Sequence, residues 1–171
     1  MKRVAVFGKP GSGKSTLSKR LAATTGLPFH PLDAILYQPS GEQIDRETFD
    51  TLHQEILNQE HWIIDGFGPL GLFFQRLEQA DTLVYIDLPY VTSYWLVTKR
   101  LLQSLIKKPE GWPEGSSVLS GTLNSYRTLK RCPQFWNDDF LAKLETISQN
   151  KRCVILRSVT DINQFLNKCR N

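Results

Sequence analysis

One glycine-rich segment constrains the fold of this chain more than any other feature: Gly8-Lys9-Pro10-Gly11-Ser12-Gly13-Lys14-Ser15, which fits the pattern G-x-x-x-x-G-K-[ST]. It follows the apolar run Arg3–Phe7 directly and precedes Lys14–Thr25, where Leu17 and Leu21 lie four residues apart on one helical face. Glycines let the backbone wrap so that several N–H groups point inward, and the free N–H groups at the start of the next helix point to the same place. The sequence therefore predicts a strand, an anion-binding loop and a helix, in that order.

The rest of the chain alternates short apolar runs with stretches of helical period, which predicts βαβ units and a parallel sheet. The expected strands are Arg3–Phe7, Pro28–His30, His61–Ile64, Thr82–Asp87 and Cys153–Arg157. The expected helices are Lys14–Thr25, Asp45 to about Asn58, Val91–Lys107, a stretch with Arg127 and Arg131, about Gln134–Ser148, and a last helix capped by Thr160. At 171 residues the chain has the length of one domain, so we expect a single α/β domain.

Two stretches carry finer predictions. The helix that Asp45 caps is expected to bury an apolar face made of Phe49, Leu52, Ile56 and Leu57. The stretch between residues 108 and 122 is rich in Gly, Pro and Ser, which is typical of a long functional or disordered loop.

Composition excludes several classes of protein. Hydrophobic residues make up 40% and charged residues 22% of the chain, which favours a globular domain over a disordered one. No stretch approaches the roughly 18 apolar residues of a membrane span, and the N-terminal apolar run is too short for a signal peptide. Cys132, Cys153 and Cys169 are scattered, with neither a disulfide framework nor metal-ligand spacing. We therefore expect a cytoplasmic protein without a membrane partner.

The charge is distributed unevenly. Residues 1–90 hold eight Lys and Arg against eleven Asp and Glu, a net charge of −3, whereas residues 91–171 have a net charge of +7. The basic half would suit phosphates or nucleic acid, or it could be a solvated face. No helix-turn-helix or aromatic RNA-binding pattern is evident.

Three stretches resemble adenylate kinases and their small-kinase relatives. They are Gly8-x-Pro10-Gly11-x-Gly13-Lys14-x-Thr16, Trp62-Ile63-Ile64-Asp65-Gly66-Phe67 and Tyr85-Ile86-Asp87-Leu88-Pro89. Within that superfamily the chain is most similar to a bacterial group labelled "DNA topology modulation protein", on His30-x-Leu32-Asp33-Ala34 and on Trp62-Ile63-Ile64-Asp65-Gly66. The resemblance implies a P-loop fold with strand order 2-3-1-4-5, helices on both faces and a short lid. It also implies ATP and Mg²⁺ as cofactors, and the label implies an influence on DNA.

The same resemblance assigns roles to individual residues. The nucleotide would contact Gly8, Gly11, Ser12, Gly13, Lys14, Ser15, Thr16 and, at the base, Arg157. Ser15 and Asp65 would serve the metal ion; the alternative for Asp65 is a cap before Gly66. The expected catalytic residues are Lys14, Arg100, Arg127, Arg131 and Asp33.

The catalytic candidates divide between an acceptor segment at about 33–60 and a lid at about 107–131. Asp33 would orient or deprotonate an acceptor hydroxyl, or else cap a short helix. Arg127 and Arg131 lie four residues apart on one helical face and could close on a γ-phosphate; the alternative is a solvated basic helix.

The chain also departs from the adenylate kinase pattern. Leu96 stands where that family has the arginine that stacks on the base, and after Asp65-Gly66-Phe67 no arginine follows until Arg76. We therefore expect ATP·Mg²⁺-dependent phosphoryl transfer to an unidentified small hydroxyl- or phosphate-bearing acceptor. The alternatives are an ATP-binding regulator associated with DNA and a slow ATPase that acts as a switch.

Overall fold

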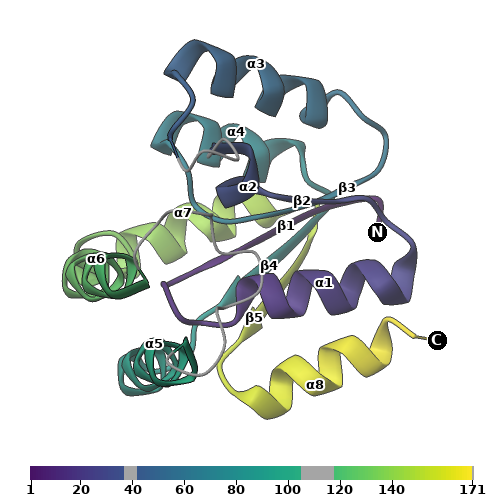
Figure 1. Ribbon diagram of the computed structural model, residues 1–171. Coiled ribbons are helices and arrows are strands. Elements are labelled where there is room, and N and C mark those ends of the chain that lie inside the picture. The colour runs from purple at the N-terminus through teal and green to yellow at the C-terminus, as the bar shows by residue number, and fades with distance from the viewer. Residues whose placement is uncertain (37–41, 105–117, 171) are drawn as a thin grey trace.

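The computed structural model describes residues 1–36, 42–104 and 118–170, and its centre is a five-stranded parallel sheet (Figure 1). The strands lie in the order β2-β3-β1-β4-β5, which confirms the predicted fold class and strand order. Their bounds are β1 Arg3–Gly8, β2 Phe29–Pro31, β3 Trp62–Asp65, β4 Thr82–Ile86 and β5 Arg152–Leu156. Each expected strand is therefore present, with its ends shifted by one residue at most.

Helices cover both faces of this sheet. Their bounds are α1 Lys14–Thr25, α2 Leu32–Leu36, α3 Arg46–Leu57, α4 Leu70–Gln79, α5 Tyr90–Ser104, α6 Val118–Arg131, the 3₁₀ turn η1 Cys132–Gln134, α7 Asp138–Ser148 and α8 Val159–Lys168. None of these helices is long and apolar enough to cross a membrane.

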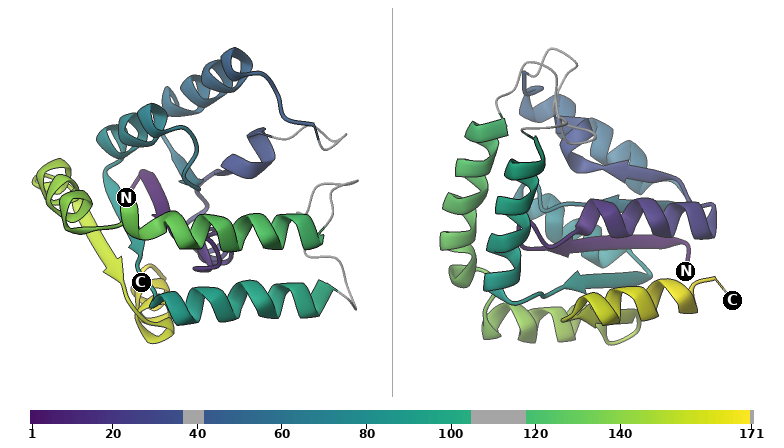
Figure 2. Two further views of the ribbon diagram at one scale, coloured as in Figure 1. Left: turned by 90° about the vertical axis from the view of Figure 1, so that its left-hand side faces the viewer. Right: turned by 60° about the horizontal axis from the view of Figure 1, so that its bottom comes forward.

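Strand β1 shows why the sheet has two covered faces. Val4 and Val6 pack into one buried cluster with α1 and α8, whereas Ala5 and Phe7 pack into another with α2, α3, α4 and α7. Side chains alternate between the two faces of a strand, so a central strand that is apolar at every position must be buried on both sides. Helices α5 and α6 run antiparallel and pack against each other (Figure 2).

Several local predictions need correction. Asp45 caps α3, because its side chain accepts a hydrogen bond from the Thr48 N–H at 2.9 Å. Leu52, however, is 38% exposed, and the neighbouring His53 is buried instead. The last helix is capped by Ser158 rather than Thr160, in a capping box with Asp161.

Two further elements differ from the prediction. Helix α7 begins at Asp138, after an Asn137 cap, and not near Gln134. Helix α4 was not predicted, although Leu70, Phe73, Phe74 and Leu77 have helical spacing. The Gly/Pro/Ser-rich stretch was expected to continue to residue 122, but α6 already begins at Val118, so its last residues are helical. The rest of that stretch and the expected end of the helix before it fall on residues 105–117, outside the described residues.

Candidate active site

The glycine-rich loop after β1 wraps closely around its neighbours. Gly8 has a φ of 147°, and a Cβ atom there would lie 2.3 Å from the carbonyl oxygen of Ile86. Gly11 has a φ of 72°, and a Cβ atom there would lie 2.7 Å from the carbonyl oxygen of Ser93. Only glycine fits such positions, so the loop is held against the end of β4 and against α5 in the left-handed conformations that an anion-binding nest requires.

Lys14 lies at the start of α1, where its Nζ donates a hydrogen bond to the carbonyl oxygen of Lys9 at 2.8 Å. Burial lowers the pKa of Lys14, and the carboxylates of Asp65 and Asp33 oppose this shift while Arg100 adds to it. The Lys14 ammonium at the start of α1 is therefore within electrostatic reach of two carboxylates from other strand ends and of a guanidinium from α5.

Asp65 is the last residue of β3 and is 3% exposed. Burial raises the pKa of its carboxyl group, while a hydrogen bond with the Ser15 side chain and the charge of Lys14 act against that rise. Its Oδ2 atom has no hydrogen-bond partner among the described residues.

This donor set fits Mg²⁺. A hydroxyl and a carboxylate are hard oxygen ligands, and Mg²⁺ is usually held by one or two such groups together with phosphates and water. Within the described residues no group of three or more His, Cys, Asp or Glu gathers to hold a metal by protein ligands alone. Ser15 and Asp65 could hold the ion only together with a phosphate ligand or water.

Asp33 is exposed and lies in the first turn of α2, directly after β2. Because the helix begins at Leu32, Asp33 does not occupy the capping position that the alternative interpretation requires. Its charge raises the pKa of Arg100 against the stronger effect of burial, which places these two groups within electrostatic reach. The Arg100 guanidinium also donates to the Ser125 hydroxyl at 3.2 Å, so it joins α5 to α6.

Arg127 and Arg131 lie on α6, and both are exposed. Among the described residues neither guanidinium has a hydrogen-bond or ion-pair partner, so both are available to an anion. Cys132, directly after Arg131, is buried within electrostatic reach of Lys14 and Lys9. The carboxyl end of α6 therefore approaches the loop, and Arg131 lies nearer to it along the helix than Arg127.

Arg157 follows β5 and is exposed, with its Nε atom 4.0 Å from Oδ2 of Asp87. Asp87 in turn forms an ion pair with Lys9, whose side chain is buried in the loop. Sequence reasoning missed this pair. The available signal was that Asp87 directly follows the buried strand β4, much as Asp65 ends the buried strand β3.

Sequence reasoning also missed a buried pair of polar side chains behind the site. Arg76 of α4 and His53 of α3 are both 0% exposed, and Arg76 donates hydrogen bonds to the carbonyl oxygens of Gly66 and Phe67. The helical spacing of α4 was the signal that could have revealed Arg76. No pattern in the sequence marks His53.

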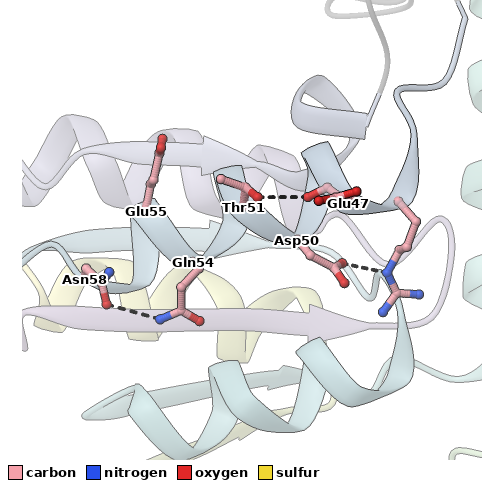
Figure 3. Close-up of a pocket in the computed structure, with 7 residues that line it drawn as sticks. Glu47, Asp50, Thr51, Gln54, Glu55 and Asn58 are labelled. Atoms are coloured by element: carbon pink, nitrogen blue, oxygen red, sulfur yellow. Dashed lines mark hydrogen bonds and ion pairs between the residues drawn. The ribbon is translucent and has the colours of Figure 1, made fainter.

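A shallow hollow runs along the outer surface of α3 (Figure 3). Six of its seven lining residues belong to that helix, and the seventh, Asn58, caps its end. Several of them pair with each other, as Arg46 does with Asp50 at 2.6 Å. None of the candidate catalytic residues lines it. We therefore place the candidate site at the carboxyl edge of the sheet and not in this hollow.

Comparison with known proteins supports the kinase fold. No family model matches the chain. A shikimate kinase from Parabacteroides distasonis is 31% identical over 100 residues, which span 50% of this chain and 58% of that enzyme. The match thus covers little more than half of the relative's length.

Two solved structures share the fold over nearly the whole chain. Shikimate kinase from Acinetobacter baumannii in complex with shikimate has a TM-score of 0.59 at 15% identity, covering 98% of this chain and 90% of that one. Shikimate kinase from Bacteroides thetaiotaomicron has a TM-score of 0.56 at 16% identity, covering 98% and 95%. The chain therefore has the fold of small P-loop kinases. These similarities give no support to the narrower resemblance to the DNA topology modulation group.

Proposed function

We propose that this protein transfers the γ-phosphoryl group of ATP to a hydroxyl group of a small molecule. The observation that supports this most is that Lys14, Asp65 and Asp33 lie at or after the ends of three neighbouring strands and interact electrostatically at the carboxyl edge of the sheet. Ligands of open α/β folds bind at this edge. A phosphate cradle, a buried metal-type carboxylate and an exposed carboxylate are the parts that phosphoryl transfer to a hydroxyl requires.

Each residue has a defined task in this proposal. The loop from Gly8 to Thr16 binds the phosphate tail, and the Lys14 ammonium exchanges the Lys9 carbonyl for a phosphate oxygen. Ser15 and Asp65 hold Mg²⁺, which neutralises charge on the phosphates when bound. Arg157 lies against the base.

The reaction step uses the acceptor-side carboxylate and the three arginines of α5 and α6. Asp33 accepts the proton of the acceptor hydroxyl as its oxygen bonds to the γ-phosphorus, and the bond from that phosphorus to the bridging oxygen breaks to release ADP. Arg100, Arg127 and Arg131 stabilise the charge on the transferring group.

The acceptor side favours a hydroxyl compound over a nucleotide. Between residues 31 and 90 the only Lys or Arg residues are Arg46 and Arg76. Arg46 is exposed and paired with Asp50, while Arg76 is buried and donates to backbone carbonyls. His53, also buried, has its pKa lowered to about 4 and is neutral at physiological pH. This segment has no unpaired cation to bind an acceptor phosphate.

The test is a combined thermal-shift and transfer screen with ATP·Mg²⁺. The acceptors are nucleosides, nucleoside monophosphates and small hydroxylated acids, including shikimate, the ligand named for the solved structure from Acinetobacter baumannii. A ligand at roughly 100 times its Kd adds about 2.7 kcal/mol, or roughly 5–10 °C in Tm for a chain of this size. We expect ATP·Mg²⁺ to stabilise the protein and one class of hydroxyl compound to receive the phosphoryl group.

Other outcomes would contradict parts of the proposal. Transfer to a nucleoside monophosphate would overturn the acceptor class. Slow ADP release that no acceptor accelerates would replace the kinase with an ATPase switch. Absence of any ATP·Mg²⁺ stabilisation would remove the proposed function altogether.

A further inference from the structure

The Arg76 guanidinium is a full charge in the interior of the protein. It is 0% exposed, and its two NH2 hydrogen bonds run to the carbonyl oxygens of Gly66 at 2.8 Å and Phe67 at 3.1 Å. Its NH1 atom lies 3.3 Å from Nε2 of His53. Its Nε atom has no hydrogen-bond partner among the described residues. A buried cation is costly unless its donors are satisfied, so the hydrogen bonds that Arg76 does form to the two carbonyl oxygens favour one geometry of this turn.

The two carbonyl groups belong to the turn that directly follows Asp65. The N–H of Gly66 donates to the carbonyl oxygen of Val6 at 3.1 Å, while its own carbonyl accepts from Arg76. Gly66 is thus tied to β1 on one side and to α4 on the other. This double attachment leaves the peptide after Asp65 little freedom to rotate.

The same turn reaches the acceptor side. Gly66 has a φ of 114°, and a Cβ atom there would lie 3.1 Å from Cβ of Leu32 in α2. The turn therefore packs against the helix that carries Asp33. A shift of this turn would therefore change the surroundings of the Asp65 and Asp33 carboxylates together.

Arg76 also acts on Asp65 through its charge. Lys14 and Arg76 both lower the pKa of Asp65, against the larger effect of burial. Lys14 begins α1 and Arg76 belongs to α4, so two cations from different elements act on the Asp65 carboxylate.

We infer that Arg76 is a positioning residue that fixes the turn after β3 and thereby keeps the Asp65 carboxylate beside Ser15 for the metal–nucleotide complex. Arg76 touches neither nucleotide nor acceptor, because it is fully buried. The inference rests on the proposed function, since it needs Mg²⁺ and ATP to bind at Ser15 and Asp65.

The experiment measures Tm at saturating ATP while Mg²⁺ is titrated, and again with ATP and a chelator. The variants are Arg76→Met, which removes all donors, and Arg76→Lys, which keeps the charge but not the planar fork. The matched control is Leu77→Ala, the next residue of α4, which is also 0% exposed and forms no bond to the turn. We expect Arg76→Met to raise the Mg²⁺ concentration for half-maximal stabilisation about 10–100-fold, and Arg76→Lys to raise it less.

Leu77→Ala should lower Tm through a cavity without moving the Mg²⁺ midpoint. ATP stabilisation in the presence of chelator should be the same in all four proteins. Equal Mg²⁺ midpoints for Arg76→Met, Leu77→Ala and the wild type would overturn the inference. If Arg76→Met is insoluble, the Mg²⁺ midpoint of Arg76→Lys is compared with that of Leu77→Ala, and equal midpoints would again overturn the inference. If the wild type itself shows no Mg²⁺-dependent stabilisation, the proposed function is wrong. This outcome differs from equal midpoints, which would overturn only the role of Arg76.

Discussion

The Nζ atom of Lys9 lies 2.5 Å from Oδ1 of Asp87, so the second residue of the glycine-rich loop is joined to the residue after β4. The Tyr85 hydroxyl donates to the same oxygen at 3.1 Å, and burial raises the pKa of Tyr85, which keeps that proton in place. The Lys9 ammonium also lies 4.7 Å from the centre of the Tyr90 ring. These contacts hold the loop to the sheet before any ligand is present.

Asp87→Asn should destabilise the protein, because it leaves the buried Lys9 ammonium without an opposite charge. Fully buried pairs lose about 3–5 kcal/mol in this way, and the Asp87 side chain is 28% exposed, so we expect about 1–3 kcal/mol. Urea unfolding measures the free energy. In a Lys9→Met background the same substitution should cost far less, whereas additive costs in the double-mutant cycle would show that the two groups are not coupled.

Lys14→Ala should weaken ATP binding at least about tenfold, since hydrogen bonds to charged groups contribute about 1.5–3 kcal/mol. Its only described hydrogen bond is to the Lys9 carbonyl, so stability without ligand should change little. Thermal shift with ATP·Mg²⁺ measures both. Lys19→Ala, an exposed lysine on the same helix, is the control. Normal ATP binding by Lys14→Ala would contradict the role given to that side chain.

Asp33→Asn should separate binding from transfer. We expect the stabilisation free energy that ATP·Mg²⁺ adds to remain within a few tenths of a kcal/mol of the wild-type value. The transfer rate should fall about 10²–10⁴-fold through loss of a general base. Coupled ADP detection with the acceptor from the screen measures the rate. Equal losses of ATP stabilisation and of transfer would place Asp33 in the nucleotide site instead.

Arg131→Ala should lower kcat by at least about tenfold with a smaller change in the KM for ATP, because a guanidinium that neutralises the transferring group acts in the transition state. Lys130→Ala is a close control, since Lys130 is also exposed and directly precedes Arg131 on α6. Adjacent residues of a helix lie about 100° apart around its axis, so the two side chains are on different faces. Steady-state kinetics of both variants give the comparison. Equal effects would indicate a general electrostatic attraction of the basic helix.

His53 should make stability depend on pH. Burial and the neighbouring Arg76 lower its pKa from 6.5 to about 4, so between these values the unfolded chain binds a proton that the folded protein does not. The contribution is fully present above about pH 6.5 and is lost as the pH falls towards 4, by on the order of 3 kcal/mol. An arginine has only donors, so Nε2 accepts, and His53→Gln preserves that acceptor without titrating. Urea unfolding at pH 7 and pH 4.5 should show a smaller loss for His53→Gln than for the wild type; equal losses would contradict the assignment.

The strand pattern could be predicted because its cause is local. Strand β1 is apolar at successive positions, which a strand covered on both faces requires, and the loop after it needs glycine where a Cβ would strike Ile86 or Ser93. The left-handed C-cap at Gly26 and the Asp45 cap likewise depend on single residue types at helix ends.

The rotation of a helix was harder to predict. Leu52 and His53 lie about 100° apart on α3, and either could have faced the core by spacing alone. The buried choice is His53, because Arg76 of α4 supplies a donor for its ring. A contact between residues 23 positions apart in the chain has no trace in the periodicity of α3.

From the sequence alone we could predict the five strands, most of the helices and the glycine-rich loop, because these depend on period, on glycine and on short-range geometry. The folded chain was needed to show that Asp33 and Asp65 act electrostatically on Lys14, that Lys9 pairs with Asp87 and that Arg76 is buried against the turn after β3. Their neighbours come from other elements, and the burial that changes their charge states exists only once the sheet is assembled.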